Sequence, residues 1–255
     1  MPVFTAIDAV LFDLGGTLLD YPIPSWPVMV GQCARGAYGY LTKPERDLPP
    51  PATKIPDPSE ARARRKRVPP DSALAHRAMM ALRRMVRSLS GRTLPRVAEA
   101  CARPLVAEGH VFDDTLPALR TLRDRGYRLG LISNTPWGTP DYLWTGQLER
   151  FGLAAYFEVA LFSSDVGFRK PDGRIFRMAL QRLGLAPERV VFVGDNPVAD
   201  VLGAQRAGLA SVLIVRPGCL SSGVSPVPDL RIESLAELPG HLPGPKTVDG
   251  SRPAP

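Results

Sequence analysis

Short apolar runs that end on polar residues alternate with helical patterns along this chain, and this alternation constrains the fold more than any other feature. The runs are rich in Val, Ile, Leu and Phe, and each has about the length of one strand. They are AVLFDLGG at residues 9–16, YRLGLISN at 127–134, VALFSS at 159–164, VVFVGDN at 190–196 and SVLIVRPG at 211–218. Strands that are apolar throughout are typical of parallel sheets covered on both faces. The sequence therefore predicts an α/β core around a parallel sheet.

Helical segments separate these runs, as the connections between parallel strands require. We expect helices over residues 111–126, 140–152, 173–184 and 198–208. Asp113 or Asp114 is expected to cap the first of them, and Gly126 to end it. A last strand is expected at 230–232 and a short helix after it, whereas the polar, proline-rich residues 243–255 are expected to be disordered.

Residues 20–110 interrupt this alternation. Their first half is rich in proline and arginine, as in LPPPATKIPDP and ARARRKRVPP, and is expected to be loop-like and flexible. Their second half has helical patterns over 74–89 and over 95–108, although Pro104 interrupts the second pattern. We interpret residues 20–110 as a helical cap inserted after the first strand, and residues 1–19 and 111–242 as the core.

Polar side chains follow the first four of these runs along the chain. They are Asp13 and Thr17, then Ser133 and Asn134, then Lys170, then Asp195, Asn196 and Asp200. Each could by itself be a turn former or a helix cap. In open parallel sheets, however, ligands bind at the carboxyl ends of the strands, so four such groups at one edge indicate a site.

These residues also make sense chemically as one site. Asp13 and Asp195 offer the hard oxygen ligands that Mg²⁺ prefers. A carboxylate such as Asp13 can act as a nucleophile and form an aspartyl-phosphate. Ser133, the amide of Asn134 and Lys170 could hold the remaining phosphoryl oxygens, and Lys170 could also restrain Asp13 through an ion pair. The predicted ligand is therefore a small anionic, phosphorylated molecule.

Four segments of the chain resemble the four signature motifs of the haloacid dehalogenase superfamily. They are FDLGGTLLD, LGLISNT, the lysine of GFRKPDGRIF, and VVFVGDNPVAD, in the order and spacing of that family. The resemblance covers residues 8–20 and about 112–216. It implies a Rossmann-like doubly wound core, a cap after the first motif, a Mg²⁺ site and an aspartyl intermediate. It also assigns Asp13 as nucleophile, Thr17 to the phosphate site, and Asn196 and Asp200 to supporting positions.

Gly15 departs from that resemblance, because the family's phosphatases usually carry a second aspartate at this position. The backbone carbonyl that binds the metal is kept, whereas the carboxyl that acts as general acid and base is lost. Such catalysis is typically worth about 10² to 10⁴ in rate. Aryl or acyl phosphates, whose leaving groups need protonation least, are the preferred substrates. Asp20 and His76 are weaker candidates for a substitute acid.

Other readings of Gly15 stay open at this stage. Members that cleave carbon–halogen bonds resemble this pattern but work without a metal, whereas VVFVGDNPVAD is suited to hold one. Carbon–phosphorus cleavage needs a cap lysine, and the available ones lie in loop-like sequence: Lys43, Lys54 and Lys66. A catalytically weak binding module is the remaining class, and the retention of Asp13, Lys170 and Asp195 speaks against it.

Charge and composition favour some ligands and cellular locations of the protein over others. Residues 43–108 carry fifteen Lys and Arg against seven Asp and Glu, which accounts for the net charge of +7. Because no aromatic residues interleave with RARRKR at 62–67, steering of anionic substrates is favoured over nucleic-acid binding. The amino end does not resemble a signal peptide, and no apolar stretch is long enough for a membrane span. Three widely spaced cysteines favour a cytoplasmic protein.

Overall fold

A six-stranded, fully parallel sheet forms the centre of the computed structural model, which describes residues 4, 6–21, 36, 93–136, 139–216 and 226–244. The strand order is β5-β4-β1-β6-β7-β8. The strands are β1 (Ala9–Phe12), β4 (Arg128–Ser133), β5 (Val159–Phe162), β6 (Val190–Gly194), β7 (Ala210–Ile214) and β8 (Leu230–Ile232). The predicted parallel α/β fold is thus confirmed.

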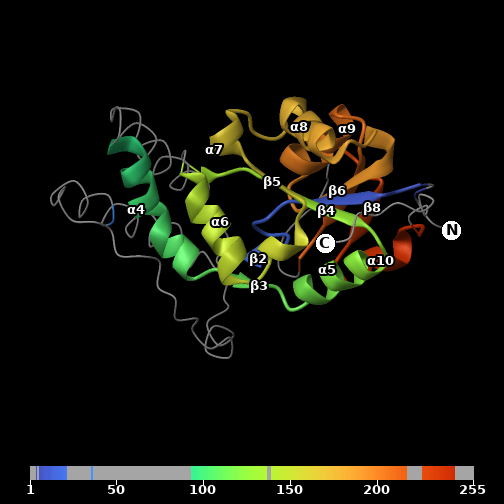
Figure 1. The fold of residues 1–255 in the computed structure, drawn as a ribbon, viewed down its shortest axis with the longest axis horizontal. Coiled ribbons are helices and arrows are strands. Elements are labelled where there is room, and N and C mark those ends of the chain that lie inside the picture. Colours follow the sequence, from blue (N-terminus) through green and yellow to red (C-terminus); the bar gives the residue numbers. More distant parts are fainter. Residues whose placement is uncertain are drawn as a thin grey trace.

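Helices cover both faces of this sheet, with α8 and α9 on one side and α5 and α10 on the other (Figure 1). The helices that follow β3 are α5 (Thr115–Asp124), α6 (Asp141–Arg150), α7 (Ser163–Val166), α8 (Gly173–Leu183), α9 (Gly203–Arg206) and α10 (Leu238–His241). Short helical turns occupy Ala154–Tyr156, Pro187–Arg189 and Pro197–Leu202.

The side chains of β1 show how one strand serves both layers. Val10 and Phe12 belong to the apolar cluster that contains Leu119 and Leu122 of α5. Ala9 and Leu11 belong to the cluster that contains Ile175 and Phe176 of α8. Successive side chains of a strand point to opposite faces, so a strand buried on both sides must be apolar throughout.

The strand order places the ends of three central strands side by side. From β1 the chain winds outward through β4 and β5, and it then crosses back to β6 on the other side of β1. A crevice forms at such a reversal, outside the carboxyl ends of the strands. The polar residues that follow β1, β4 and β6 are therefore brought to one place.

A small antiparallel pair stands at the boundary of the predicted cap. Strand β2 (Leu19–Asp20) pairs with β3 (His110–Val111), so residues 20 and 110 are neighbours. Between them, the structure describes Tyr21, Gly36 and residues 93–109, which include helix α4 (Thr93–Ala107). The helix predicted over 74–89 and residues 245–255 of the predicted tail lie outside the described residues. The boundaries of the cap stay a prediction.

Helix α4 continues through Pro104, which the sequence pattern treats as an interruption. Proline has no N–H, so the Ala100 carbonyl loses its usual helical donor. Gly36 lies against that carbonyl, because a Cβ on Gly36 would come within 2.3 Å of the Ala100 oxygen. The helix thus continues through the proline, and Gly36 packs against the carbonyl that lacks its usual donor.

Two local predictions need correction. The segment predicted as one helix over 198–208 begins at Pro197 with a wider π-helical turn and becomes α-helical only at Gly203. Asp114 does stand at the amino end of α5, but its side chain does not cap that helix. Its carboxylate instead receives donors from Arg216, Ser234 and Leu235. Among the described helices, none has the length and apolar character needed to cross a membrane.

Candidate active site

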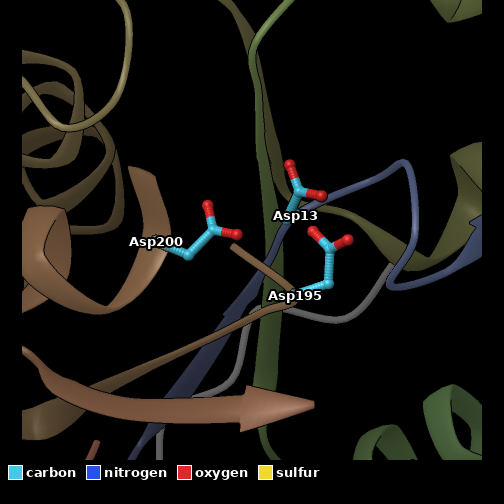
Figure 2. Close-up of side chains that lie close together, drawn as sticks. All are labelled: Asp13, Asp195 and Asp200. Carbon is cyan, nitrogen blue, oxygen red and sulfur yellow. The ribbon is translucent and has the colours of Figure 1, made fainter. Parts of the chain in front are cut away.

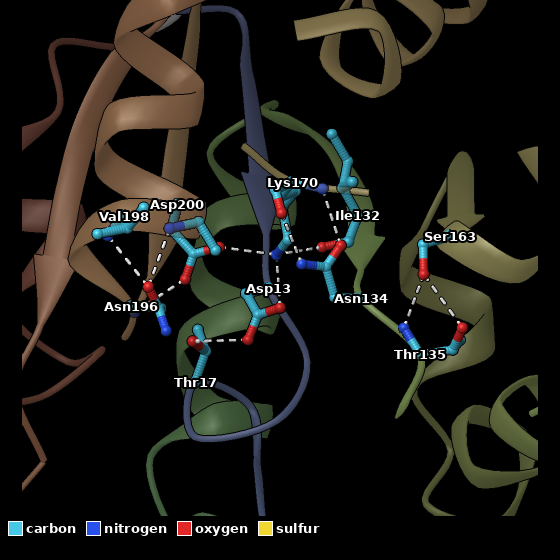
Figure 3. A network of polar contacts seen from close by, with 11 residues as sticks. Asp13, Thr17, Ile132, Asn134, Thr135, Ser163, Lys170, Asn196, Val198 and Asp200 are labelled. Atoms are coloured by element: carbon cyan, nitrogen blue, oxygen red, sulfur yellow. Dashed lines mark hydrogen bonds and ion pairs between the residues drawn. The ribbon is translucent and has the colours of Figure 1, made fainter. Parts of the chain in front are cut away.

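Asp13 lies directly after β1 with both carboxylate oxygens engaged (Figure 3). Its backbone N–H donates to the Val193 carbonyl at 2.9 Å, which keeps it aligned with β6. The Lys170 ammonium lies 2.6 Å from Asp13 Oδ1, and the Thr17 hydroxyl lies 3.5 Å from Oδ2. The predicted restraint of Asp13 by Lys170 is present.

The Lys170 ammonium is buried and lies close to three oxygens, two of them as hydrogen-bond acceptors and Asp200 Oδ1 as an ion-pair partner. These are Asp13 Oδ1, Asp200 Oδ1 at 2.8 Å and the Ile132 carbonyl at 2.8 Å. Burial alone would lower the pKa of the ammonium, but the charges of Asp13 and Asp200 outweigh burial and raise this pKa. Lys170 is therefore a fixed positive charge between two carboxylates.

The side chain of Asn134 fixes the backbone of Lys170. Its Oδ1 accepts from the Lys170 N–H at 2.9 Å, and its Nδ2 donates to the Lys170 carbonyl at 3.0 Å. A strand-end residue that the sequence assigns to phosphate binding thus uses its side chain to hold the lysine. Ser133, the preceding residue, is buried at the end of β4, and its hydroxyl forms no hydrogen bond with the described residues.

Asp200 is held on both of its oxygens. Besides the Lys170 contact on Oδ1, its Oδ2 accepts from the Asn196 N–H at 2.9 Å. The Asn196 side chain in turn caps the helical turn by accepting from the N–H groups of Val198 and Ala199. Burial raises the pKa of Asp200 to about 6 although Lys170 opposes the shift, and the charge of Asp13 adds to the increase.

Three carboxylates meet at this edge of the sheet: Asp13, Asp195 and Asp200 (Figure 2). One carboxylate oxygen from each lies within 4.8 Å of the other two. Asp195 is exposed at the surface, but the protein atoms around its carboxyl, followed by the charges of Asp13 and Asp200, raise its pKa to about 8. Among the described residues, the cluster joins three carboxyl groups to one ammonium, so ionisation of all three carboxyls leaves a negative charge that a divalent cation would balance.

The donor set also fits Mg²⁺ chemically. Both Asp200 oxygens have close protein partners, at 2.8 and 2.9 Å, whereas the Thr17 hydroxyl lies 3.5 Å from Asp13 Oδ2. Asp13 and Asp195 are therefore better placed than Asp200 to offer an oxygen to a metal. No described residue donates a hydrogen bond to the Gly15 carbonyl, so this oxygen is available as a further ligand. Carboxylates, a carbonyl and waters are the ligands that Mg²⁺ takes in proteins.

Two glycines allow the carboxylates to approach the backbone so closely. A Cβ on Gly16 would lie 2.2 Å from Asp195 Oδ2, and this residue also has a positive φ of 86°. A Cβ on Gly194 would lie 2.3 Å from Asp200 Oδ2. Larger residues at either position would displace a carboxylate of the cluster.

Tyr21 lies beside the missing side chain of Gly15. A Cβ on Gly15 would meet the Tyr21 ring at 3.4 Å, an ordinary contact, and the ring packs edge-on against Trp144 at 6.1 Å between centroids. Burial and then the charge of Asp13 raise the pKa of the Tyr21 phenol above its usual range. The sequence did not identify Tyr21 as a site residue, because it belongs to none of the four motifs.

Of the two residues that the sequence offers as a substitute general acid, the structure describes only Asp20. Asp20 is buried in β2 and faces His110 of β3, with its Oδ2 3.6 Å from the imidazole Nε2. Its carboxyl is thus part of the strand pair. His76 lies outside the described residues, as do the cap lysines Lys43, Lys54 and Lys66.

The parallel sheet, the Asp13–Lys170 pair and the carboxylate cluster at the strand ends define a hydrolase of the haloacid dehalogenase type. The family model described as haloacid dehalogenase-like hydrolase matches residues 7–208, and the chain belongs to this family. The predicted family and the Rossmann-like fold are confirmed.

Several curated relatives of the chain are phosphatases by name. The chain is 42% identical over 135 residues to a phosphoserine phosphatase of Thermus thermophilus, which covers 53% of this chain and 50% of the relative. It is 43% identical over 103 residues to a glyceraldehyde 3-phosphate phosphatase of Methanothermobacter thermautotrophicus, with 40% and 44% covered. The chain thus spans about half the length of these curated relatives.

Solved structures of both chemical classes resemble the whole chain. A phosphatase of this superfamily from Thermococcus onnurineus is 25% identical, with a TM-score of 0.62 over 94% of this chain and 100% of the other. A 2-haloacid dehalogenase from Pseudomonas syringae is 26% identical, with a TM-score of 0.58 over 92% and 97%. The fold is therefore shared by phosphatases and dehalogenases. The choice between these two activities must be argued from the residues of the site.

The raised pKa of Asp195 predicts how a Mg²⁺ ion bound at this cluster would stabilise the protein at different pH values. In the unfolded chain this carboxyl loses its proton near the usual aspartate value, whereas in the folded protein it keeps the proton up to about pH 8. The stability of the metal-free protein is therefore expected to fall as the pH rises between these two values. Because Mg²⁺ binds the ionised carboxylate, its stabilising effect should grow over the same range.

Thermal unfolding with and without saturating Mg²⁺ tests this expectation. The increase in melting temperature should be larger at about pH 8 than at about pH 6. In the Asp195→Asn variant, Mg²⁺ should raise the melting temperature only slightly at both pH values. An equal increase in the wild type at both pH values would contradict the assignment of Asp195 as a metal ligand.

Proposed function

We propose that this chain is a Mg²⁺-dependent phosphohydrolase that acts on a small phosphorylated metabolite through an aspartyl-phosphate at Asp13. The observation that carries the proposal is the buried Lys170 ammonium between Asp13 and Asp200, beside the Asp195 carboxylate. The names of the phosphatase relatives favour the same substrate class.

The proposed reaction has two steps at Asp13. In the first, a carboxylate oxygen of Asp13 forms a bond to phosphorus while the bond to the leaving-group oxygen breaks. In the second, water attacks the aspartyl-phosphate, which releases inorganic phosphate and restores Asp13. When bound, Mg²⁺ would supply positive charge to the phosphoryl oxygens.

The protein's own residues orient and neutralise the substrate. Lys170 fixes Asp13 Oδ1 with a direct contact, and its charge attracts the phosphoryl group. We assign the binding of the phosphoryl oxygens to three residues. They are Ser133 through its hydroxyl, Asn134 through its backbone N–H, and Thr17. The side chain of Asn134 is committed to Lys170, so its substrate contact is assigned to the backbone.

The preferred leaving group follows from Gly15. The described carboxylates at the site are those of Asp13, Asp195 and Asp200, and each already has a role in the cluster. A leaving group that departs without a proton therefore suits this site best, as in aryl and acyl phosphates. Carbon–halogen cleavage also needs no such acid, but the excess of carboxylates favours a metal and hence phosphoryl transfer.

We further propose that residues 20–110 form a cap that selects the substrate. The pairing of β2 with β3 supports this proposal, because it brings the two ends of the segment together beside the site. The basic character of the segment suits the steering of anions, an effect that weakens with salt. A cytoplasmic location is proposed on the wide spacing of the three cysteines.

Hydrolysis of p-nitrophenyl phosphate and of an alkyl phosphate by the wild type, Gly15→Ala and Gly15→Asp tests the function. The wild type is expected to hydrolyse the aryl phosphate with Mg²⁺, to lose activity with EDTA, and to act poorly on the alkyl phosphate. Gly15→Asp is expected to raise alkyl phosphate hydrolysis by about 10²-fold, because it restores an acid near the leaving group.

The Gly15→Ala variant is the matched control, since it adds the Cβ next to Tyr21 without the carboxyl. It should resemble the wild type on both substrates. If all three proteins bind Mg²⁺ but are inert towards both esters, the phosphohydrolase proposal is wrong and a binding module becomes the better reading.

A further inference from the structure

Arg216 contacts the loop that carries the nucleophile, although it lies outside the four motifs. It follows β7 closely, is buried, and donates from Nη2 to the Thr17 carbonyl at 2.5 Å. Its guanidinium also lies over the Phe112 ring, 3.9 Å from the centroid. A planar guanidinium can stack on an aromatic ring and donate in its plane at the same time.

The other arm of this guanidinium binds Asp114. Arg216 Nη1 lies 2.5 Å from Asp114 Oδ2, the same oxygen that accepts from the Ser234 hydroxyl at 2.7 Å and the Leu235 N–H at 2.8 Å. Partial burial would raise the pKa of Asp114, but the hydrogen bonds from Arg216 and Ser234 outweigh burial and lower it. Asp114 therefore stays ionised and joins the start of α5 to the segment before α10.

A second contact fixes the next carbonyl of the loop. The Thr115 hydroxyl donates to the Leu18 carbonyl at 2.9 Å, and the Phe112 N–H donates to the same oxygen at 3.2 Å. The carbonyls of Thr17 and Leu18 are the last two before β2. Arg216, which packs on Phe112, holds the first of them. Residues that follow β3 hold the second. The loop between Asp13 and Leu18 is anchored at its far end.

We propose that Arg216 is a positioning residue, which holds the Asp13–Leu18 loop so that the Asp13 carboxylate and the Gly15 carbonyl face a common metal. The inference rests on the proposed function. The near end of the loop is fixed by the bond from the Asp13 N–H to Val193. Arg216 and Thr115 fix the far end, and Gly15 and Gly16 lie between the two anchors. Within the loop, the Gly16 N–H donates to the Leu19 carbonyl at 2.7 Å, and loss of the far anchor removes the restraint that holds this turn against the rest of the protein.

A matched ion pair stands at the opposite end of the same sheet. Arg189, just before β6, donates from Nε to Asp8 Oδ2 at 2.6 Å and pairs with Oδ1 through Nη2, and Asp8 lies just before β1. Like the Arg216–Asp114 pair, it is partly buried and joins an arginine to an aspartate far apart in sequence. It lies at the amino ends of the strands, away from the carboxylate cluster.

The Arg216→Gln and Arg189→Gln variants separate positioning from plain stabilisation. Titration calorimetry with Mg²⁺ alone and kinetics with p-nitrophenyl phosphate are measured beside thermal unfolding. Both variants are expected to melt at lower temperature than the wild type. Only Arg216→Gln is expected to lose Mg²⁺ affinity and turnover, each by about 10- to 100-fold, as happens when groups behind metal ligands are removed. Its KM should change less than its turnover number.

The Thr115→Val variant provides a second, milder test if Arg216→Gln does not fold. Valine keeps the shape of threonine but loses the bond to the Leu18 carbonyl, so Mg²⁺ affinity should fall several-fold while the protein stays folded. If the wild type binds Mg²⁺ and turns over, but Arg216→Gln or Thr115→Val binds Mg²⁺ like Arg189→Gln, the positioning role is wrong and the function stands. If the wild type neither binds Mg²⁺ nor hydrolyses the ester, the proposed function fails as well.

Discussion

Replacement of Asp13 by asparagine is expected to lower the turnover number on an aryl phosphate by about 10⁴-fold or more, because the nucleophile is lost. Asparagine has nearly the same shape, so the loop and the bond from its N–H to Val193 should be kept. The cluster loses one of its three carboxyl groups, and Lys170 keeps Asp200 as a partner. The Asp13→Asn variant should therefore fold and melt close to the wild type.

The covalent intermediate gives a readout that a general loss of activity cannot imitate. An aspartyl-phosphate is reduced by borohydride, so wild type quenched during turnover should carry a reduced residue at position 13, detected by mass spectrometry. Asp13→Asn should carry none. The exposed Asp124 at the end of α5 serves as the control, since Asp124→Asn should react like the wild type. Full labelling at another carboxylate, with Asp13 unmodified, would falsify the assignment of the nucleophile.

The positions of the strands could be read from the sequence, because a parallel sheet buried on both faces demands continuous apolar runs. The same reading placed Asp13, Ser133 and Asp195 at one edge, since parallel strands share the direction of their ends. The structure brings Lys170 onto Asp13 across 157 residues of chain. In that case the motif order made a distant pair predictable.

Contacts that depend on tertiary packing were out of reach of the sequence pattern. Asp114 follows the rule for a helix cap, but Arg216, 102 residues further along, takes its carboxylate. Pro104 follows the rule for a helix break, but helix α4 continues through it, with Gly36 packed against the Ala100 carbonyl. Asn134 could have bound phosphate with its side chain, and only the fold shows that Lys170 uses it. Local sequence rules give the possible conformations and contacts of a residue, and tertiary packing determines which of them forms.

Replacement of Lys170 by methionine is expected to lower the free energy of unfolding by about 3–5 kcal/mol at pH above 8, because it leaves carboxylates buried without their partner. Methionine keeps most of the length and apolar volume of the side chain, so the loss reports the charge. Turnover should also collapse, since Asp13 loses the contact that fixes its Oδ1. Arg174→Met, which removes an exposed cation paired with Asp172, is the control and should change stability little.

The pH dependence of this effect distinguishes lost charge from lost packing. Lys170 lowers the pKa values of Asp195 and Asp200, which stand at about 8 and about 6 in its presence, so its removal raises both further. These carboxyls then keep their protons at about pH 5, where the missing ammonium matters least, and lose them as the pH rises. The stability difference from the wild type, measured by denaturant unfolding without metal, should therefore be small at about pH 5 and large above pH 8. A difference of the same size at both pH values would mean that Lys170 acts by packing alone, and its place as the counter-charge of the active site would have to be given up.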